Sequence, residues 1–419
     1  MKAEEAILAI RDGLRVFVGS GAAVPLGLLD AFCARAKHYK DVEVCQLLTL
    51  GPAPYTAREL EGHVRHNAFF VGANTREAVQ EGRADFTPVF LSEIAGVLRT
   101  TMPIDVALVQ VSPPDKHGFC SLGVSVDIVK VAVETARVVV AEVNPRMPRT
   151  HGDAFVHVSR LSSIVETDHA LPELVAEPID DVARAIGENV AGLVRDGDTL
   201  QMGIGAIPNA ALAALGNHKD LGVHTEMFSD GVVDLVEKGV ITNARKTHRR
   251  GKLVTTFVMG TKRLYDFVDD NPLIEMRPSH YANDPAIVAK NRGMVSINSA
   301  LAVDLTGQVC ADSIGSRIYS GVGGQVDFVR GAAKAENGRP IIALRSTAKN
   351  GTISRIVPEL AAGSGVTTSR ADVHWVVTEH GAANLHGKNV RQRVEALVGI
   401  AAPQFRDELR AAAKARHWG

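Results

Sequence analysis

The chain has 419 residues, of which 46% are hydrophobic and 22% are charged, the balance of a globular protein. Its 46 Lys and Arg residues nearly match its 47 Asp and Glu residues, which gives a net charge of −1. This balance argues against binding to nucleic acid or to an anionic membrane surface, because no basic excess is available to bind phosphate groups. The length predicts two or three domains.

The four cysteines are scattered, without a Cys-x-x-Cys pair. This spacing predicts neither a zinc site nor a disulfide framework, and it fits a reducing compartment. The sequence contains no run of about 18 apolar residues, which argues against a membrane-spanning helix. We therefore expect a cytoplasmic protein with no metal site.

The first predicted elements recur 184 residues further along the chain. Arg11-Asp12-Gly13 precedes an apolar strand and the turn Gly19-Ser20-Gly21, and Arg195-Asp196-Gly197 precedes an apolar strand and the turn Gly203-Ile204-Gly205. Each copy predicts a helix, an Asp-Gly turn, a short strand, a Gly-x-Gly turn and an Ala/Leu-rich helix, which is the start of an α/β unit. The repeat predicts two similar α/β domains.

Further short apolar runs alternate with helical patterns in both halves, at 105–112, 137–143, 252–259, 340–346 and 371–379. Such nearly continuous apolar strands are typical of parallel sheets that are covered on both faces. A polar segment with prolines at 170–185 separates the halves. The sequence thus predicts an α/β fold of two related domains, 1–177 and 178–419, each with a mostly parallel sheet flanked by helices.

The two Gly-x-Gly turns differ from the dinucleotide-binding fingerprint, which has Gly or Ala at its last position. That position is Val24 in the first turn and Pro208 in the second. A Rossmann dehydrogenase is therefore disfavoured. A tight turn with free N–H groups at a helix N-terminus can still bind an anion or an oxyanion, and a purely structural role is the alternative.

Glu226 follows the apolar run 221–224, at the predicted carboxyl end of a strand. Open α/β sheets bind their ligands at this edge. Glu226 comes one β–α step after the Gly203–Gly205 turn, so we expect both to face the same crevice. A surface or capping role is the common alternative for a single glutamate, and Glu379 beside His380 is a rival catalytic carboxylate.

A third glycine cluster contains Gly321, Gly323 and Gly324. Glycine permits a close backbone approach that a Cβ atom would block, although a plain turn explains the cluster equally well.

Many segments together resemble the class I CoA-transferases, specifically the acetyl-CoA hydrolase/transferase family with its 4-hydroxybutyrate, butyrate and acetate CoA-transferases. They cover nearly the whole chain in the family's order: 111–127, 141–153, 200–212, 224–231, 257–272, 298–309, 320–332, 346–358 and 377–388. Such a set is far more specific than one glycine turn. The resemblance implies two related α/β domains, in agreement with the internal repeat.

The resemblance also implies residue roles. Glu226 matches the family's nucleophilic glutamate, the backbone N–H groups of Ile204 and Gly324 match the oxyanion donors, and Asn283 matches a residue that contacts a carboxylate. The predicted substrate- or CoA-binding residues are Gly203, Gly205, Asn283, Gly321, Gly323, Gly381 and Lys388. At one position the chain departs from the family, because it has Ala302 where relatives usually have Glu. If the glutamate at this position stabilises the site in relatives, that stabilisation is absent here or comes from another residue.

We therefore predict an acyl-CoA:carboxylate CoA-transferase that moves CoA between short-chain carboxylic acids through a glutamyl-CoA thioester on Glu226. Its substrates are an acyl-CoA and a carboxylate, no cofactor is permanently bound, and we expect a homodimer. The alternatives are an acyl-CoA hydrolase and a non-catalytic CoA-binding protein. The sequence leaves the pair of acids open.

Overall fold

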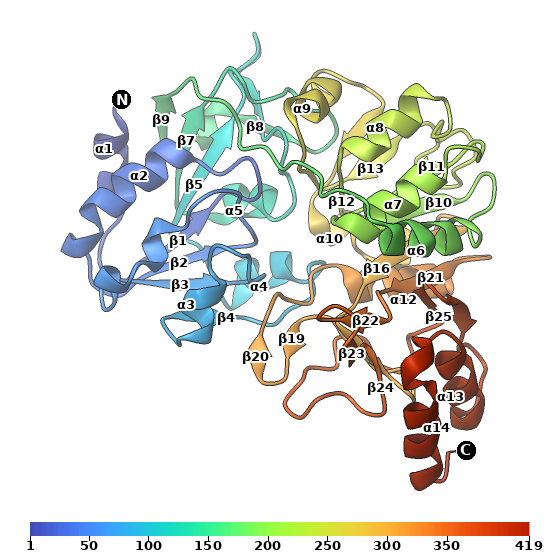
Figure 1. Cartoon of the computed structure of the whole chain (residues 1–419). Coiled ribbons are helices and arrows are strands. Elements are labelled where there is room, and N and C mark those ends of the chain that lie inside the picture. Colours follow the sequence, from blue (N-terminus) through green and yellow to red (C-terminus); the bar gives the residue numbers. More distant parts are fainter. Residues whose placement is uncertain (419) are drawn as a thin grey trace. The chain divides into compact units, whose positions relative to one another are not determined.

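The computed structural model describes residues 1–418, which divide into two compact units (Figure 1). Unit 1 consists of Met1–Val175 together with Val254–Ala282. Unit 2 consists of Ala176–Leu253 and the chain from Asn283 onward. The boundary between two domains at residues 177 and 178 therefore stays a prediction. The predicted α/β class, with mostly parallel sheets flanked by helices, is confirmed.

The sheet of unit 1 has the strand order β4-β3-β2-β1-β5-β7-β9, and neighbouring strands are parallel. Strand β5, inside this sheet between β1 and β7, is buried along its whole length, as the continuous apolar run predicts. The strands are β1 (Arg15–Val18), β2 (Val42–Gln46), β3 (Val64–Ala68), β4 (Ala84–Phe86), β5 (Val106–Val111), β7 (Val138–Val143) and β9 (Ser163–Glu166).

Within the described residues, unit 1 also contains two small two-stranded sheets and seven α-helices. Strand β6 (Phe119–Ser121) pairs with β8 (Phe155–His157) in an antiparallel ribbon, and β13 (Leu253–Thr255) pairs with β15 (Ile274–Met276). The helices are α1 (Ala3–Ala6), α2 (Leu26–Arg35), α3 (Arg76–Gln80), α4 (Ile94–Thr100), α5 (Val129–Thr135), α9 (Lys262–Val268) and α10 (Ser279–Ala282).

The sheet of unit 2 has the order β11-β10-β16-β21-β25-β26, parallel except for the antiparallel edge strand β26. Its strands are β10 (Thr199–Met202), β11 (Gly222–Val223), β16 (Met294–Ser299), β21 (Arg339–Ala343), β25 (Trp375–Thr378) and β26 (Gly381–Asn384). The helices are α6 (Asp181–Ala191), α7 (Ala206–Ala214), α8 (Asp230–Glu237), α11 (Pro285–Val288), α12 (Gln325–Lys334), α13 (Val390–Gly399) and α14 (Arg406–Ala415).

Shorter strands in unit 2 form small pairs outside the main sheet. They include β17 (Ala302–Asp304), β18 (Val309–Cys310), β19 (Ser313–Ile314), β20 (Arg317–Ile318), β22 (Thr347–Ala348), β23 (Ile353–Ser354) and β24 (Ile356–Val357). Helices α13 and α14 lie side by side at the C-terminal end of the unit (Figure 1). Among residues 1–418, no helix combines the length and the apolar character that crossing a membrane requires.

Side-chain caps define where helices of unit 2 begin. The Asp180 carboxylate accepts a hydrogen bond from the Ala183 N–H at the start of α6, and its two oxygens also bind the Arg345 guanidinium at 2.8 and 3.0 Å. Asn389 and Gln392 form a reciprocal capping box at the start of α13. Because each cap satisfies N–H groups that a helix leaves unpaired, these residues fix the first turns.

The repeated Arg-Asp-Gly segment forms the same turn in both units. Gly13 and Gly197 have φ values of +70° and +83°, a region that favours glycine. The N–H of each glycine donates to a lysine carbonyl at 2.9 Å, Lys40 in unit 1 and Lys219 in unit 2. The preceding aspartate accepts the N–H of that lysine at 2.9 and 2.8 Å. The sequence repeat is therefore also a structural repeat.

Candidate active site

Two predicted site segments follow neighbouring strands of unit 2. The turn Gly203–Gly205 follows β10, and Glu226 comes three residues after β11. The two strands are parallel, with Leu200 opposite Val223. The Thr225 hydroxyl accepts the Met202 N–H at 3.4 Å, which ties the two strand ends together, and it donates to the Met227 carbonyl at 2.8 Å. Glu226 therefore leaves the sheet beside the glycine turn.

The Glu226 carboxylate contacts two residues that are distant in the sequence. The Asn283 side-chain amide donates to Glu226 Oε2 at 3.0 Å, and Asn283 is fully buried. A Cβ atom on Gly324 would lie 1.9 Å from the same oxygen and 2.3 Å from Asn283 Nδ2. Gly324 has φ −96°, which other residues adopt readily, so space and not conformation requires glycine here.

The glycine turn after β10 leads directly into α7. Gly205 has φ +113°, a region that favours glycine, and Ala206 is the first residue of the helix. Ile204 between the two glycines is 41% exposed, although the strand before it is buried. In the described chain, the Ile204 N–H donates no backbone hydrogen bond. The turn therefore presents an unsatisfied donor at a helix N-terminus.

The Gly-Gly segment precedes helix α12 in the connection from β16 to β21. Gly324 is the N-cap residue of this helix, and its carbonyl accepts the Phe328 N–H at 3.0 Å. Gln325, the next residue, anchors the helix start by donating to the Ser299 carbonyl at 2.8 Å and accepting the Thr368 hydroxyl at 3.0 Å. These bonds hold the Gly324 backbone against the carboxylate.

The rival carboxylate Glu379 has a different environment. One of its oxygens accepts the Ser346 N–H at 2.9 Å and the other accepts the Ser346 hydroxyl at 2.6 Å. Ser346 and Glu379 follow the adjacent strands β21 and β25, so these two hydrogen bonds hold the two strand ends together. Both oxygens of Glu379 are thus engaged by Ser346, whereas Oε2 of Glu226 is engaged by the Asn283 amide.

The other predicted site residues lie elsewhere in unit 2. Gly381 begins the edge strand β26, opposite Thr378, and the Lys388 ammonium donates to the Asn384 carbonyl at 2.7 Å. Strand β26 lies at the opposite end of the sheet order from β11. Thus the structure brings Glu226, Asn283 and Gly324 into contact but does not place Gly381 and Lys388 in that cluster.

The remaining glycines and the atypical alanine lie in loops and short strands. Gly321 and Gly323 belong to the loop before α12, where Gly323 has φ +55°. Ala302 opens the short strand β17, opposite Cys310 of β18. Sequence analysis missed Thr225 and Gln325, although both adjoin a predicted residue and carry hydrogen-bonding side chains of the kind that orient neighbours.

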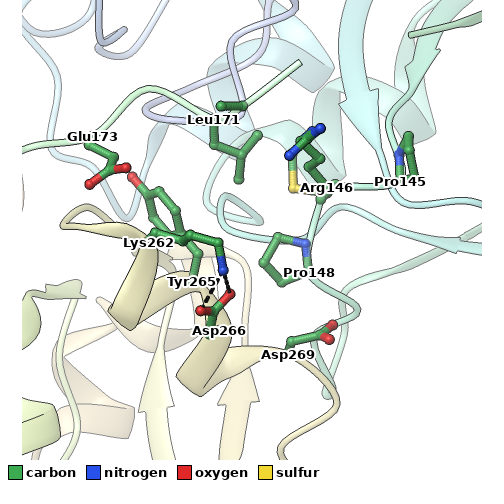
Figure 2. A pocket seen from close by; sticks show the side chains of 11 residues that line it. Pro145, Arg146, Pro148, Leu171, Glu173, Lys262, Tyr265, Asp266 and Asp269 are labelled. Carbon is green, nitrogen blue, oxygen red and sulfur yellow. Dashed lines mark hydrogen bonds and ion pairs between the residues drawn. The ribbon is translucent and has the colours of Figure 1, made fainter. Parts of the chain in front are cut away.

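A cavity of about 320 Å³ lies within unit 1 and contains none of the predicted site residues (Figure 2). Two of its polar side chains are already paired. Lys262 binds Asp266 at 2.7 Å one helical turn away (Figure 2), and the Tyr265 hydroxyl donates to the Pro172 carbonyl at 2.7 Å. In residues 1–418, no group of three or more His, Cys, Asp or Glu side chains is arranged to hold a metal ion.

Comparison with known protein families covers both parts of the chain. Residues 1–176 match the acetyl-CoA hydrolase/transferase N-terminal domain, and residues 260–413 match the acetyl-CoA hydrolase/transferase C-terminal domain. The chain belongs to the acetyl-CoA hydrolase/transferase family. This membership confirms the family predicted from the sequence motifs.

Individual family members agree with this assignment. The chain is 51% identical to the 4-hydroxybutyrate coenzyme A transferase of Clostridium kluyveri, over 97% of this chain and 95% of that protein. It is 50% identical to the succinyl-CoA:acetate/propanoyl-CoA:succinate CoA transferase of Fasciola hepatica, over 96% and 85% of the two chains. The crystal structure of RipA from Yersinia pestis superposes with a TM-score of 0.95 at 39% identity, covering 100% and 98% of the two chains. The chain is an enzyme that transfers CoA.

Proposed function

We propose that this family member is an acyl-CoA:carboxylate CoA-transferase for short-chain acids, with acetyl-CoA as a donor and 4-hydroxybutyrate or butyrate as the acid partner. The names of its relatives support this choice of substrates, since they include a 4-hydroxybutyrate coenzyme A transferase and a butyryl-CoA:acetate CoA-transferase. The observation that carries the mechanism is the contact of Asn283 and Gly324 with the Glu226 carboxylate.

In the proposed reaction, a Glu226 oxygen attacks the thioester carbonyl of the acyl-CoA. Collapse of the adduct expels CoA thiolate and leaves an acyl-glutamyl anhydride. The thiolate then attacks the glutamyl carbonyl, which releases the first carboxylate and forms a glutamyl-CoA thioester. The incoming carboxylate runs the same steps in reverse, so CoA moves to the new acid and Glu226 is restored.

Orientation explains why a weak nucleophile such as a carboxylate suffices. The Asn283 amide holds one oxygen of Glu226 at 3.0 Å, and the backbone at Gly324 limits its movement on another side. Both contacts reduce the freedom of the side chain before the thioester arrives. A side chain that is already held in place loses less conformational entropy on reaching the transition state, which lowers the activation barrier.

Each addition step places negative charge on a carbonyl oxygen. We assign its stabilisation to the backbone N–H groups of Ile204 and Gly324, which lie in the turns at the starts of α7 and α12. The unsatisfied Ile204 N–H supports this role. Loss of one such donor typically costs about 3–4 kcal/mol of transition-state stabilisation.

Transfer to an acid is favoured over transfer to water by the comparisons. Relatives named as CoA-transferases include chains 36–51% identical over almost the whole length, whereas a relative named acetyl-CoA hydrolase is 26% identical over 82% of this chain. Thiol release from acetyl-CoA should therefore depend on added carboxylate. Release at the same rate without any added acid would contradict the transferase assignment.

The covalent intermediate provides a direct test. Incubation with acetyl-CoA followed by intact-mass and peptide-mass measurement should give a CoA adduct on the peptide that contains Glu226, and Glu226→Gln should give none. Glu379→Gln is the matched control, because an amide still accepts and donates at Ser346 and the adduct should persist. An adduct on Glu379, or parental turnover in Glu226→Gln, would overturn the proposal.

A further inference from the structure

A second cleft lies at the amino edge of the same unit 2 sheet. Its volume is about 510 Å³, and it includes Arg339 at the start of β21, Gly293 just before β16 and Asp198 just before β10. Glu226 and the glycine turn follow the carboxyl ends of the strands. Since β10 runs four residues from Thr199 to Met202, about 13 Å of strand separates the two edges.

The cleft has a strongly positive lining in a chain that carries a net charge of only −1. Of the described residues that line it, six are cationic and two are carboxylates. The others are small or polar, with no aromatic ring and no large aliphatic side chain. The full lining is Arg195, Asp196, Gly197, Asp198, Ala244, Arg245, Lys246, Thr247, Arg250, Arg292, Gly293, Asn337 and Arg339.

The two carboxylates in the lining are already engaged by the protein. Asp198 forms a buried ion pair with Arg339 and accepts the Arg195 N–H at 2.7 Å. Asp196 accepts the Lys219 N–H at 2.8 Å, the bond that closes the Arg-Asp-Gly turn. Both carboxylates are therefore bound within the protein, and among the cations of the lining Arg292 pairs with Glu336 at 3.2 Å.

Several cations keep their binding capacity. Within residues 1–418, the exposed side chains of Arg195 and Arg245 form no ion pair with a carboxylate. Arg339 is only 8% exposed, and its Nε–H has no hydrogen-bond partner although the group is buried. Arg339 therefore adds a largely desolvated guanidinium to the wall of the cleft, where its charge acts more strongly than it would in water.

The same turn in unit 1 shows that the fold does not require this lining. A Cβ atom on Gly13 would meet nothing within 4 Å, whereas one on Gly197 would lie 2.5 Å from the guanidinium carbon of Arg245. The turn and its hydrogen bonds are common to both units, but the arginine packed on it occurs in unit 2. The cationic lining is thus an addition to a shared structural turn.

We propose that this cleft is a binding site, separate from the catalytic carboxylate, for a compact diphosphate group. Guanidinium groups match phosphate oxygens with two parallel hydrogen bonds and keep their charge at all physiological pH values. The lining offers no apolar surface to a nucleobase, so the phosphates carry the recognition. The diphosphate comes from inorganic pyrophosphate or from the phosphate part of a nucleotide or of CoA itself.

Titration calorimetry with inorganic pyrophosphate on the full chain tests the site. We expect saturable binding that weakens as salt is raised and that falls at least tenfold in the double variant Arg195→Gln/Arg245→Gln. Both residues are exposed, so the fold should tolerate the changes, which circular dichroism checks. Arg11→Gln is the matched control, because Arg11 stands at the equivalent turn of unit 1 and its loss should leave binding unchanged.

Two further arms define the ligand and the independence of the site. ADP should bind within tenfold of pyrophosphate, 3′,5′-ADP should bind more weakly because its two phosphates form no diphosphate, and Glu226→Gln should leave pyrophosphate binding intact. No saturable binding, equal binding by the double variant, a nucleotide preference above tenfold, or loss of binding in Glu226→Gln would each overturn the proposal. The readout needs no turnover, so failure of the transferase assignment would leave it interpretable.

Discussion

The two Gly-x-Gly turns occupy equivalent positions in their units, yet one is closed and the other is open. In unit 1, Ser20 is 2% exposed and its hydroxyl donates to the buried Asp127 at 2.9 Å. The Gly21 N–H is used by the Leu48 carbonyl at 2.6 Å. In unit 2, Ile204, the counterpart of Ser20, is 41% exposed, and the N–H of Gly205, the counterpart of Gly21, donates no backbone hydrogen bond in the described chain.

This difference shows that the turn alone does not make a binding site, because the surrounding residues decide whether its N–H groups stay free. A turn whose donors are satisfied by the protein stabilises the fold, whereas a turn that keeps a donor free can stabilise a ligand. Unit 1 fills the space beside its turn with Asp127, and unit 2 places Glu226 next to its turn. Substitutions that exchange or remove these features should therefore affect stability in unit 1 and catalysis in unit 2.

The largest expected effect comes from Glu226→Gln, which keeps the shape of the side chain but removes the nucleophile. Turnover of acetyl-CoA with 4-hydroxybutyrate should fall by about 10⁴-fold or more, because loss of a covalent nucleophile removes the main reaction route. The melting temperature should stay close to that of the parent. A variant that keeps more than a tenth of the parental kcat would show that Glu226 is not the nucleophile and that unit 2 has no catalytic carboxylate beside its turn.

Gly324→Ala should have the next largest effect. The new Cβ atom would lie 1.9 Å from Glu226 Oε2, so either the carboxylate or the α12 N-terminus must move. We expect kcat to fall by about 10²- to 10³-fold, the cost of disturbing one oxyanion donor. Gly96→Ala in α4 is the control, since nothing lies within 4 Å of its Cβ position and alanine favours a helix. Equal activity in both variants would show that Gly324 has no special role.

Asp127 should make the stability of unit 1 depend on pH. Burial raises the pKa of its carboxyl from 3.8 to about 6, although the Ser20 hydroxyl and backbone N–H groups oppose this shift. Between these values the folded state holds a proton that the unfolded state has released. The free energy of unfolding therefore falls as pH rises through this range, by up to about 3 kcal/mol from this group.

Asp127→Asn is the test, because it removes the titrating group with little change of shape. Denaturant unfolding from pH 4 to pH 7 should show a smaller decline in the variant than in the parent. The same decline in both proteins would assign the pH dependence to other groups, such as Glu142, whose pKa is also raised by burial.

Ser20→Ala should have the smallest effect of the series. It removes the hydroxyl that donates to Asp127 at 2.9 Å, which should lower the free energy of unfolding by about 1–2 kcal/mol at pH 7. The kcat for CoA transfer should not change, in contrast to Gly324→Ala in unit 2. A loss of activity larger than the loss of folded protein would mean that the unit 1 turn takes part in catalysis.

Much of the architecture could be predicted from the sequence. The repeated Arg-Asp-Gly and Gly-x-Gly segments predicted two related α/β units, and the structure confirms the class because such turns have local causes, namely positive φ at glycine and short apolar strands. The family was predicted from motifs along the whole chain and is confirmed. The place of Val254–Ala282 in unit 1 was beyond this reasoning, because no local pattern records which sheet a segment joins.

The candidate site could be predicted only in part. Glu226 and Gly324 were named from motifs, but their contact joins residues almost a hundred positions apart in the sequence and depends on packing. Glu226 was preferred to Glu379 from the family resemblance, whereas the contact of Glu379 with Ser346, 33 residues away along the chain, depends on the pairing of two strands and was not predicted. The roles themselves stay predictions until the adduct and the variants are measured.

For this protein, the amino-acid sequence by itself determined the strands, the turns and the family, because hydrophobic periodicity and glycine act over a few residues. Only the tertiary structure decided which donors are free, which carboxylates are already bound and which arginines share a cleft. Arg195 and Arg339 stand at the amino ends of β10 and β21, which the parallel sheet brings to one edge, and the loop that carries Arg245 packs on Gly197 at that edge. Such convergence is a property of the folded sheet, since it depends on strand order and register.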